Sequence, residues 1–316
     1  MEKESIMKIL ITGALGHIGS KLIHSIKPGE FEGIRLIDNM LTQRYASLFN
    51  LPNGVNFAFI EEDILKGDLI KLLTDVDCVI HLAAITDAAG SFNCRDEIEK
   101  VNYDGTKRVA EACIETNTNL LFPSTTSVYG SQSEQVDETC SIVELQPQSP
   151  YAEYKLKSEQ MLQEMGKNYG LKFVTCRFGT IFGTSIGMRF HTAVNKFCWQ
   201  AVMGQSLTVW KTAMNQKRPY LGVSDAVKAI KFIIEKNIFN GEIYNIVSSN
   251  NTVSEIVDTI RKLVPNLKVE LVDSEIMNQL SYNVISDKIK KIGFTTSNNI
   301  HTHIKSTIEQ FSSLMN

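Results

Sequence analysis

The feature that most constrains the fold is an alternation of short apolar runs with segments of helical periodicity over the first part of the chain. The runs are rich in Val, Ile, Leu and Phe, and their length and composition predict β-strands. They span residues 8–13, 33–39, 56–63, 77–83, 119–125 and 172–178. Because these runs are apolar at almost every position, each strand is expected to be covered on both faces. The alternation therefore predicts an α/β fold built on a doubly wound parallel sheet.

The rhythm changes after residue 178, where a segment that carries both tryptophans mixes aromatic and polar side chains, as the lining of a binding site does. Further strands are predicted over residues 218–223, 242–248 and 268–273. A second, smaller lobe built from the returning C-terminal segments explains this pattern. The expected organisation is a main domain over 1–178, with 218–249 returning to it, and a smaller C-terminal substrate-binding lobe made of 179–217 and 250–316.

Three glycines mark the junction between the first strand and the first helix. In "ITGALGHIGS", Gly13, Gly16 and Gly19 have GxxGxxG spacing. Glycine lets the backbone turn sharply and approach a pyrophosphate, which lies at the N-terminus of the following helix. Glycines near a turn are also common without any ligand. The strand before the loop and the helix after it favour a dinucleotide site, and hence a Rossmann-type domain.

An acidic residue at the end of the second strand strengthens the dinucleotide interpretation. Asp38 lies 19 residues after Gly19, where a carboxylate can accept hydrogen bonds from both ribose hydroxyls of an adenosine. Asn39 follows, and no Arg or Lys directly after it offers a partner for a 2′-phosphate, so the sequence favours NAD over NADP. Asp63, at the end of the third predicted strand, is placed for the adenine amine. GxxxxGK[ST] is absent, which excludes a P-loop nucleotide hydrolase.

A Tyr–Lys pair opens a later helix. In "YAEYKLK", Tyr151 and Lys155 are four residues apart and share one helix face, whereas Tyr154 has a serine at the matching position. Such a pair is also common on a solvated helix surface. Beside a nicotinamide, however, an ammonium and the positive ring would lower the pKa of the phenol, so that Tyr151 can act as a base toward an alcohol.

The end of the fifth strand supplies hydroxyl groups. "FPSTTSVYG" has Ser or Thr at positions 124 to 127, at the edge of the sheet where parallel sheets bind ligands. A Ser/Thr-rich turn can equally satisfy only its own backbone.

The bulk composition excludes several classes of protein. Net charge is −3, from 32 basic and 35 acidic residues without a basic block, which argues against a nucleic-acid or polybasic membrane partner. The start, "MEKESIMKIL", has no apolar signal region, and we expect a cytoplasmic protein. The 6 cysteines show no CxxC spacing and are expected to be reduced and structural. "HTH" at 301–303 is expected to be a solvated loop, with no metal site.

Taken together, these segments resemble the extended short-chain dehydrogenase/reductase family, specifically its NAD-dependent nucleotide-sugar epimerase/dehydratase branch. The resemblance covers nearly the whole chain and is closest in motifs to UDP-glucose 4-epimerase-like members. It rests on GxxGxxG, Asp38, "EEDI", "HLAA", "VNYDGT", "STTSVYG", "SPYAEYK" and "RPYLGVSDAV", in family order and spacing.

The resemblance implies roles for individual residues. The catalytic residues would be Thr125, Tyr151 and Lys155. Cofactor contacts would come from Gly13, Gly16, His17, Ile18, Gly19, Asp38, Asn39, Asp63, Ile64, Leu82, Ala83, Ala84, Asn102, Tyr151, Lys155 and Phe178. Substrate contacts would come from Thr86, Thr126, Asn195, Arg218 and Tyr282, with Arg218 directed at the diphosphate or ribose.

The resemblance also narrows the reaction. The 4,6-dehydratases of the branch carry Thr-Asp-Glu where this chain has Thr125, Thr126 and Ser127, so acid and base groups for dehydration are missing. The expected reaction is epimerisation of a nucleoside-diphosphate sugar at C4 through a keto intermediate. A dehydratase, a keto-sugar reductase and a non-catalytic NAD-binding protein remain alternatives. The family also implies a homodimer formed through the helices that bear Tyr151 and follow "VNYDGT".

Two departures from the family pattern bear on the identity of the nucleotide and sugar. Thr180 stands where the family usually has an asparagine, and residues 273–281 lack the second arginine that is common there.

Overall fold

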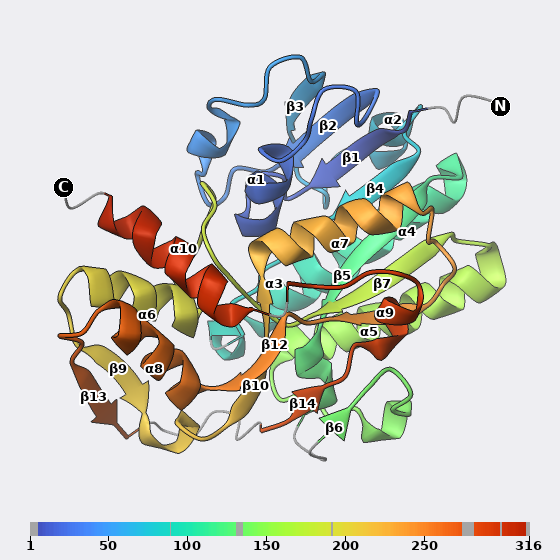
Figure 1. Ribbon diagram of the computed structural model, residues 1–316. Coiled ribbons are helices and arrows are strands. Elements are labelled where there is room, and N and C mark those ends of the chain that lie inside the picture. Colours follow the sequence, from blue (N-terminus) through green and yellow to red (C-terminus); the bar gives the residue numbers. More distant parts are fainter. Residues whose placement is uncertain are drawn as a thin grey trace.

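A seven-stranded parallel sheet forms the centre of the computed structural model, which describes residues 6–88, 90–130, 135–190, 192–273, 281–297 and 299–313 (Figure 1). In order across the sheet, the strands are β11 (Ile243–Ile246), β7 (Phe173–Phe178), β5 (Asn119–Thr125), β4 (Cys78–His81), β1 (Lys8–Thr12), β2 (Gly33–Asp38) and β3 (Phe57–Glu61). Neighbouring strands are parallel throughout. The predicted parallel sheet is thus confirmed, and the predicted strands differ from the observed ones only at their ends.

Both faces of this sheet are buried, as the continuous apolar runs predicted. Along β1, Ile9 and Ile11 join the hydrophobic cluster on one face, and Leu10 joins the cluster on the other. The first face is covered by α1 (His17–Ile23) and α7 (Val223–Glu235) (Figure 1). The second face is covered by α2 (Leu69–Leu73), α4 (Gly105–Thr116) and α5 (Pro150–Tyr169). The short α3 (Arg95–Ile98) leads through a π-helical turn over Glu99–Asp104 into α4.

Helix α5 has clear start and stop signals. The Ser149 side chain accepts a hydrogen bond from the Ala152 backbone N–H, and Pro150 occupies the first turn, where its missing N–H has no cost. Gly170 ends the helix in the left-handed conformation, at φ 72°. These signals place Tyr151 in the first turn of the helix, next to the carboxyl ends of the strands.

The C-terminal lobe has its own hydrophobic cluster. Its helices are α6 (Ala193–Val202), α8 (Val253–Leu263) and α10 (Ile300–Ser312). Around them lie β8 (Thr180–Phe182), β9 (Leu207–Trp210), β10 (Lys217–Gly222), β12 (Ser249–Thr252) and β13 (Val269–Val272). The remaining elements are the pair β6 (Gln135–Val136) and β14 (Asn283–Val284), together with α9 (Asp287–Lys291). Short 3-10 turns cover Tyr45–Leu48, Gly90–Asn93, Thr126–Tyr129, Ile142–Glu144 and Lys211–Ala213.

Two expectations differ from the structure. Residues 218–249 were expected to return to the main sheet, but β10 pairs with β8 and β12 in a separate three-stranded sheet, and only α7 and β11 rejoin the seven strands. The apolar pattern of β10 shows that it is buried but not which sheet it joins. Residues 301–303 were expected to form a loop, yet they lie in the first turn of α10, where Asn299 caps the helix and His303 packs edge-on against Phe182.

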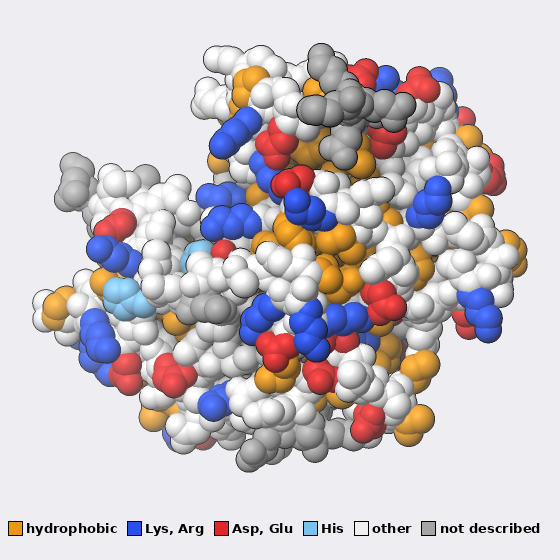
Figure 2. All heavy atoms as spheres, turned by 45° about the vertical axis from the view of Figure 1, so that its right-hand side comes forward, with side chains coloured by type: hydrophobic (Ala, Val, Ile, Leu, Met, Phe, Trp, Pro, Cys, Tyr) orange, Lys and Arg blue, Asp and Glu red, His pale blue; other side chains and the backbone are white. Residues whose placement is uncertain are grey.

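Basic and acidic side chains lie side by side over the face shown in Figure 2, consistent with the mixed charge of the sequence. Within the described part of the chain, no helix has the length and apolar character needed to cross a membrane.

Candidate active site

The glycine loop connects β1 to α1. At Gly13 and Gly19 the surrounding backbone leaves no room for a side chain. A Cβ atom on Gly13 would lie 2.6 Å from the Ala83 backbone nitrogen, and Gly13 has φ +63°, which also favours glycine. A Cβ atom on Gly19 would lie 2.7 Å from the Ala14 carbonyl carbon. The loop therefore passes close to the chain that follows β4. This tight glycine cradle at the carboxyl edge of the sheet fits the pyrophosphate of a dinucleotide.

Asp38 ends β2 and braces this loop. Its Oδ2 accepts a hydrogen bond from the Leu15 backbone N–H (3.1 Å), and its Oδ1 accepts one from the Met40 N–H (3.0 Å). Asn39 donates to Asp63 at 3.4 Å, so the two residues expected at the adenosine end lie together. Arg44, which the sequence analysis did not single out, lies near Asp38. Burial lowers the Arg44 pKa, and the charge of Asp38 opposes this shift.

A cavity of about 460 Å³ extends from this loop to the C-terminal lobe. Ten residues expected to bind cofactor or substrate or to act in catalysis line it: His17, Ile18, Leu82, Ala84, Thr86, Thr125, Tyr151, Lys155, Phe178 and Arg218. They come from the start of α1, the loop after β4, the last residues of β5 and β7, and from α5 and β10. The cavity thus lies where the carboxyl edge of the sheet faces the lobe.

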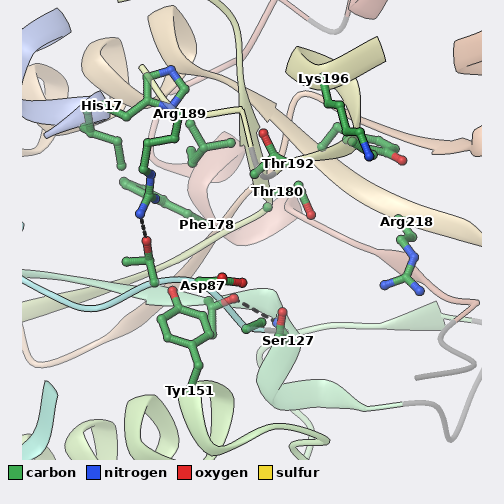
Figure 3. Close-up of a pocket in the computed structure, with 18 of the residues that line it drawn as sticks. His17, Asp87, Ser127, Tyr151, Phe178, Thr180, Arg189, Thr192, Lys196 and Arg218 are labelled. Carbon is green, nitrogen blue, oxygen red and sulfur yellow. Dashed lines mark hydrogen bonds between the residues drawn. The ribbon is translucent and has the colours of Figure 1, made fainter. Parts of the chain in front are cut away.

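Thr125, Tyr151 and Lys155 meet on the floor of this cavity. Tyr151 and Thr125 both face the cavity, and Thr125 Oγ1 accepts a hydrogen bond from the Ser127 backbone N–H (3.1 Å). Lys155 Nζ donates to the Pro123 carbonyl oxygen (2.8 Å) and lies 4.5 Å from the centre of the Phe122 ring. Tyr151 points from α5 into the cavity (Figure 3). Two adjacent elements, the end of β5 and the first turn of α5, therefore bring the three predicted catalytic residues together.

The pKa shifts identify a second cation near the phenol. Burial raises the pKa of Tyr151, and the nearby Arg189 charge and the Thr125 hydrogen bond oppose this rise. Burial lowers the pKa of Lys155 to about 7, against the opposing charge of Glu159. Lys155 was expected to provide the cation that acidifies the phenol. In this structure Lys155 is directed at the Pro123 carbonyl, and Arg189 faces Tyr151 from across the cavity (Figure 3).

Three of the expected substrate residues lie behind the cavity wall. Thr126 Oγ1 donates to the Phe178 carbonyl oxygen (3.3 Å), and the Tyr282 hydroxyl donates to the Thr126 carbonyl oxygen (3.0 Å). Asn195 is fully buried and bonds the backbone of Gly183 and of Arg189. These contacts shape the wall from behind, and direct binding by the three residues stays a prediction.

Asn102 and Ile64 were expected to contact the cofactor. In the structure they do not line the cavity but pack behind it. The Asn102 amide accepts from the Ile85 N–H and donates to the Ile85 carbonyl oxygen, both at 2.8 Å, which fixes the loop after β4. Ile64 is buried and packs so closely on Gly105 that a Cβ atom there would lie 2.7 Å away.

The structure adds lining residues that sequence reasoning missed. Arg189, Lys196 and Asp87 are the charged ones, and Thr180 and Thr192 add hydroxyl groups near them (Figure 3). The mixed aromatic and polar character of residues 179–210 was the available signal, but it does not tell which side chains face inward. Residues 274–280, within the segment that lacks the usual arginine, lie outside the described residues.

A buried ion pair lies near Lys155. Arg177 of β7 donates through Nε and Nη2 to the Glu159 carboxylate of α5, with the closest contact at 2.7 Å. The Ser124 hydroxyl donates to the same carboxylate. The pair thus ties α5 to the strand end that carries Thr125.

Comparisons with known proteins agree with this geometry. Residues 9–247 match the NAD dependent epimerase/dehydratase family. An uncharacterised UDP-glucose epimerase of Bacillus subtilis is 33% identical over 247 residues, which cover 76% of each chain. A trifunctional UDP-glucose 4,6-dehydratase/epimerase/reductase of Arabidopsis thaliana is 28% identical over 96% of this chain, which spans 47% of that protein's length.

A solved structure of a UDP-glucuronic acid 4-epimerase from Bacillus cereus, in complex with UDP-glucuronic acid and NAD, has a TM-score of 0.88 and 26% identity. It covers 98% of this chain, and this chain covers all of it. The family match spans most of the chain, including the glycine loop and the Tyr–Lys pair. The protein is therefore an enzyme of the NAD dependent epimerase/dehydratase family, with NAD as its cofactor.

Proposed function

We propose that the protein epimerises a nucleoside-diphosphate sugar at C4 through a transient 4-keto intermediate. The observation that carries the proposal is the cavity floor, where Tyr151, Thr125 and Lys155 converge while the next two positions are Thr126 and Ser127. A dehydratase needs an acid and a base beside C5 and C6, and these two positions carry neither. Solved structures of UDP-sugar 4-epimerases support the choice, although the curated relatives include both a UDP-glucose epimerase and 4,6-dehydratases.

The roles of the residues follow from their positions. Tyr151 removes the proton of the C4 hydroxyl and later returns it to the oxygen of the other epimer. Thr125 lines the cavity floor with Tyr151, and its hydroxyl holds the same substrate oxygen. Arg189 provides the positive charge that stabilises the phenolate, and Lys155 holds the end of β5 by donating to the Pro123 carbonyl oxygen. NAD bound beside this floor would supply the hydride acceptor and donor, so that the keto-sugar could turn within the cavity and be reduced on its other face.

The far end of the cavity suits the diphosphate. Arg218 and Lys196 lie on the side of the cavity away from Tyr151 (Figure 3), and Trp210 also lines the cavity. A guanidinium binds a phosphate through two parallel hydrogen bonds, which fixes its orientation as well as its charge. We assign these two cations to the substrate diphosphate and Trp210 to the neighbourhood of the nucleoside. UDP is the nucleotide that the relatives favour.

The test is conversion of sugar nucleotides by the purified protein without added NADH, followed by chromatography and mass spectrometry. UDP-glucose, UDP-N-acetylglucosamine and UDP-glucuronic acid are offered separately. Epimerisation predicts an equilibrium mixture of C4 epimers of unchanged mass. A product lighter by one water would identify a 4,6-dehydratase instead, and consumption of external NADH with a keto-sugar would identify a reductase. NAD binding with no conversion of any sugar nucleotide would contradict an enzymatic role.

We also propose a cytoplasmic homodimer formed through α4 and α5, as the family resemblance implies. The cysteines among the described residues are all free, which suits a reducing compartment. Sedimentation should give twice the chain mass of 35.4 kDa. A monomer at micromolar concentration would contradict the dimer.

A further inference from the structure

One carboxylate faces the cavity in which the sugar nucleotide is proposed to bind. Among the described residues that line this cavity, Asp87 is the only acidic one, and it lies in the loop after β4. Figure 3 shows Asp87 toward Tyr151, whereas Lys196 and Arg218 lie on the side away from Tyr151. Asp87 is therefore at the end of the cavity that we assign to the sugar.

The turn that follows Asp87 holds its carboxylate in place. Asp87 Oδ1 accepts a hydrogen bond from the Gly90 backbone N–H (3.1 Å), and the Asp87 carbonyl oxygen accepts one from the Ser91 N–H (3.0 Å). A Cβ atom on Gly90 would lie 2.7 Å from Asp87 Oδ2, so a side chain at position 90 would displace the carboxylate. An uncharged Asn or Ser can cap such a turn equally well. The turn thus explains where the side chain lies but not why it is charged.

The same turn is joined to the helix that carries the proposed base. The buried Ser91 donates from its hydroxyl to the Ala88 carbonyl oxygen (2.7 Å). The Ser91 hydroxyl also accepts a hydrogen bond from the Tyr151 backbone N–H (3.4 Å). A single residue therefore links the Asp87 turn to the first turn of α5, so the carboxylate and Tyr151 have a defined relative position.

The charges near Tyr151 offset one another. Arg189, which donates to the Thr86 hydroxyl, interacts electrostatically with both Tyr151 and Asp87. Lys155 also lines this end of the cavity, but burial lowers its pKa to about 7. The guanidinium of Arg189 and the carboxylate of Asp87 thus form one positive and one negative charge at the sugar end.

The opposite side of the cavity has a different charge pattern. Lys196 and Arg218 place two cations there, and the diphosphate of the proposed substrate carries two negative charges. Binding sites are complementary in charge to the ligands that they select. Two cations suit the diphosphate, and the balanced pair at the other end suits an uncharged sugar.

We propose that Asp87 determines which sugars the site accepts, by accepting hydrogen bonds from the hydroxyls of a neutral hexosyl group and repelling the carboxylate of a uronic acid. The inference rests on the proposed function, which places the sugar against Tyr151. An ionised carboxylate is an acceptor only, and its hydrogen bonds from hydroxyl donors are charge-assisted. A second carboxylate brought beside it meets like-charge repulsion, by which binding sites reject a wrong partner.

The test compares the dissociation constants of UDP, UDP-glucose and UDP-glucuronic acid for the NAD-loaded protein by calorimetric titration. Wild-type protein should bind UDP-glucuronic acid at least about tenfold more weakly than UDP-glucose. Asp87→Asn keeps an oxygen for the Gly90 N–H and removes the charge, so it should reduce this ratio at least about tenfold and leave UDP affinity unchanged. Epimerisation at C4 changes the charge of neither sugar, so turnover during the titration does not affect the comparison.

Asp68→Asn is the matched control. Asp68 also caps a turn, accepting a hydrogen bond from the Lys71 N–H (3.1 Å) at the start of α2, and it lines a separate hollow. Thermal unfolding in excess NAD shows whether each variant is folded, and Asp87→Ser carries the test if Asp87→Asn is not. The role of Asp87 would be overturned by a wild-type ratio in the folded variant. It would also be overturned by wild-type protein that binds both sugar nucleotides equally tightly.

Binding and conversion separate this inference from the proposed reaction. Protein that shows the expected ratio of dissociation constants but converts no sugar nucleotide contradicts only the reaction. Protein that epimerises both UDP-glucose and UDP-glucuronic acid, with equal affinity for the two, contradicts only the role of Asp87.

Discussion

At the scale of single residues, burial works against the chemistry that the site is proposed to perform. Tyr151 must lose a proton, yet burial raises its pKa, and only the Arg189 charge and the Thr125 hydrogen bond oppose that rise. Lys155 has a pKa of about 7 because its ammonium is buried against Phe122 and Pro123. Burial alone thus disfavours the phenolate, and the positive charge of bound NAD is expected to shift Tyr151 toward it.

Tyr151→Phe removes the proposed base without changing the shape of the cavity floor. We expect turnover to fall by about 10²- to 10⁴-fold, the usual contribution of a positioned acid–base group, while NAD remains bound. Tyr154→Phe is the matched control, because the Tyr154 hydroxyl donates to Glu99 and does not line the cavity. Steady-state rates of both variants on the identified sugar nucleotide make the comparison. Full activity of Tyr151→Phe would refute the mechanism.

The Lys155 pKa makes stability depend on pH in a defined direction. In the folded protein without NAD, burial lowers this pKa from 10.5 to about 7, so the folded state binds fewer protons than the unfolded chain between these values. The free energy of unfolding therefore gains a contribution that rises with pH across that window. Lys155→Met lacks this titration, so wild-type protein should gain stability relative to the variant as pH increases from 7 to 10.

Urea unfolding of both proteins at several pH values checks the prediction. Lys157→Met serves as the control, since Lys157 forms an exposed pair with Glu153 on the same helix. A stability difference between wild type and Lys155→Met that stays constant from pH 7 to 10 would show that burial does not lower the pKa of Lys155.

At the scale of elements, α5 is positioned by one buried ion pair as well as by its apolar face. The side chains of Glu159 and Arg177 are 2% and 3% exposed, and the Ser124 hydroxyl donates a further hydrogen bond to the Glu159 carboxylate. Buried pairs of this kind contribute little net stability, but breaking one leaves an unpaired charge inside the protein. The pair instead determines how α5 lies relative to β5 and β7, and hence where Tyr151 meets Thr125.

Glu159→Gln leaves the Arg177 charge buried without its partner. We expect the free energy of unfolding to fall by about 3–5 kcal/mol, as measured in urea. The double variant Glu159→Leu with Arg177→Met removes both charges and should recover much of that loss. Glu153→Gln, also in α5, breaks a solvated pair with Arg95 of α3 and should change stability little. Equal losses at positions 153 and 159 would contradict the role of burial.

At the scale of the whole molecule, the cavity is a joint product of the two lobes. The residues proposed to act in catalysis and to bind the cofactor come from the main domain, and Lys196, Trp210 and Arg218 come from the C-terminal lobe. A second link between the lobes lies away from the cavity. There Asp225 of α7 accepts hydrogen bonds from Ser248, from Ser297 and from His303, which lies in α10. A ligand that contacts both lobes is therefore expected to stabilise the molecule as a unit.

UDP should raise the thermal unfolding temperature of the NAD-loaded protein. Ligand at one hundred times its dissociation constant stabilises a protein by about 2.7 kcal/mol. UMP should do so less at equal concentration, because it lacks the second phosphate proposed to meet Arg218. Arg218→Gln should remove most of the difference between UDP and UMP, whereas Lys211→Gln, an exposed residue of the same lobe, should preserve it. Equal shifts from UDP and UMP in wild type would contradict the diphosphate assignment.

Sequence patterns are informative where the cause is local. The strand runs, the glycine loop and the Tyr151–Lys155 spacing each act within a few residues, so periodicity and turn chemistry predict them. β10 shows the limit, since a buried strand looks the same whichever sheet it joins. His303 shows it too, because its role depends on Phe182 and Asp225, both distant in sequence.

The sequence by itself determined the parallel sheet, the dinucleotide loop and the pair of residues that opens α5, because short-range backbone preferences and helical spacing suffice for these. Tertiary structure alone decided that Arg189 faces Tyr151, that Lys155 turns toward Pro123, and that Gly187 lies on the glycine loop. The Lys155–Pro123 contact joins residues 32 positions apart and the Gly187–Ser20 contact residues 167 apart, and only tertiary packing brings such segments together.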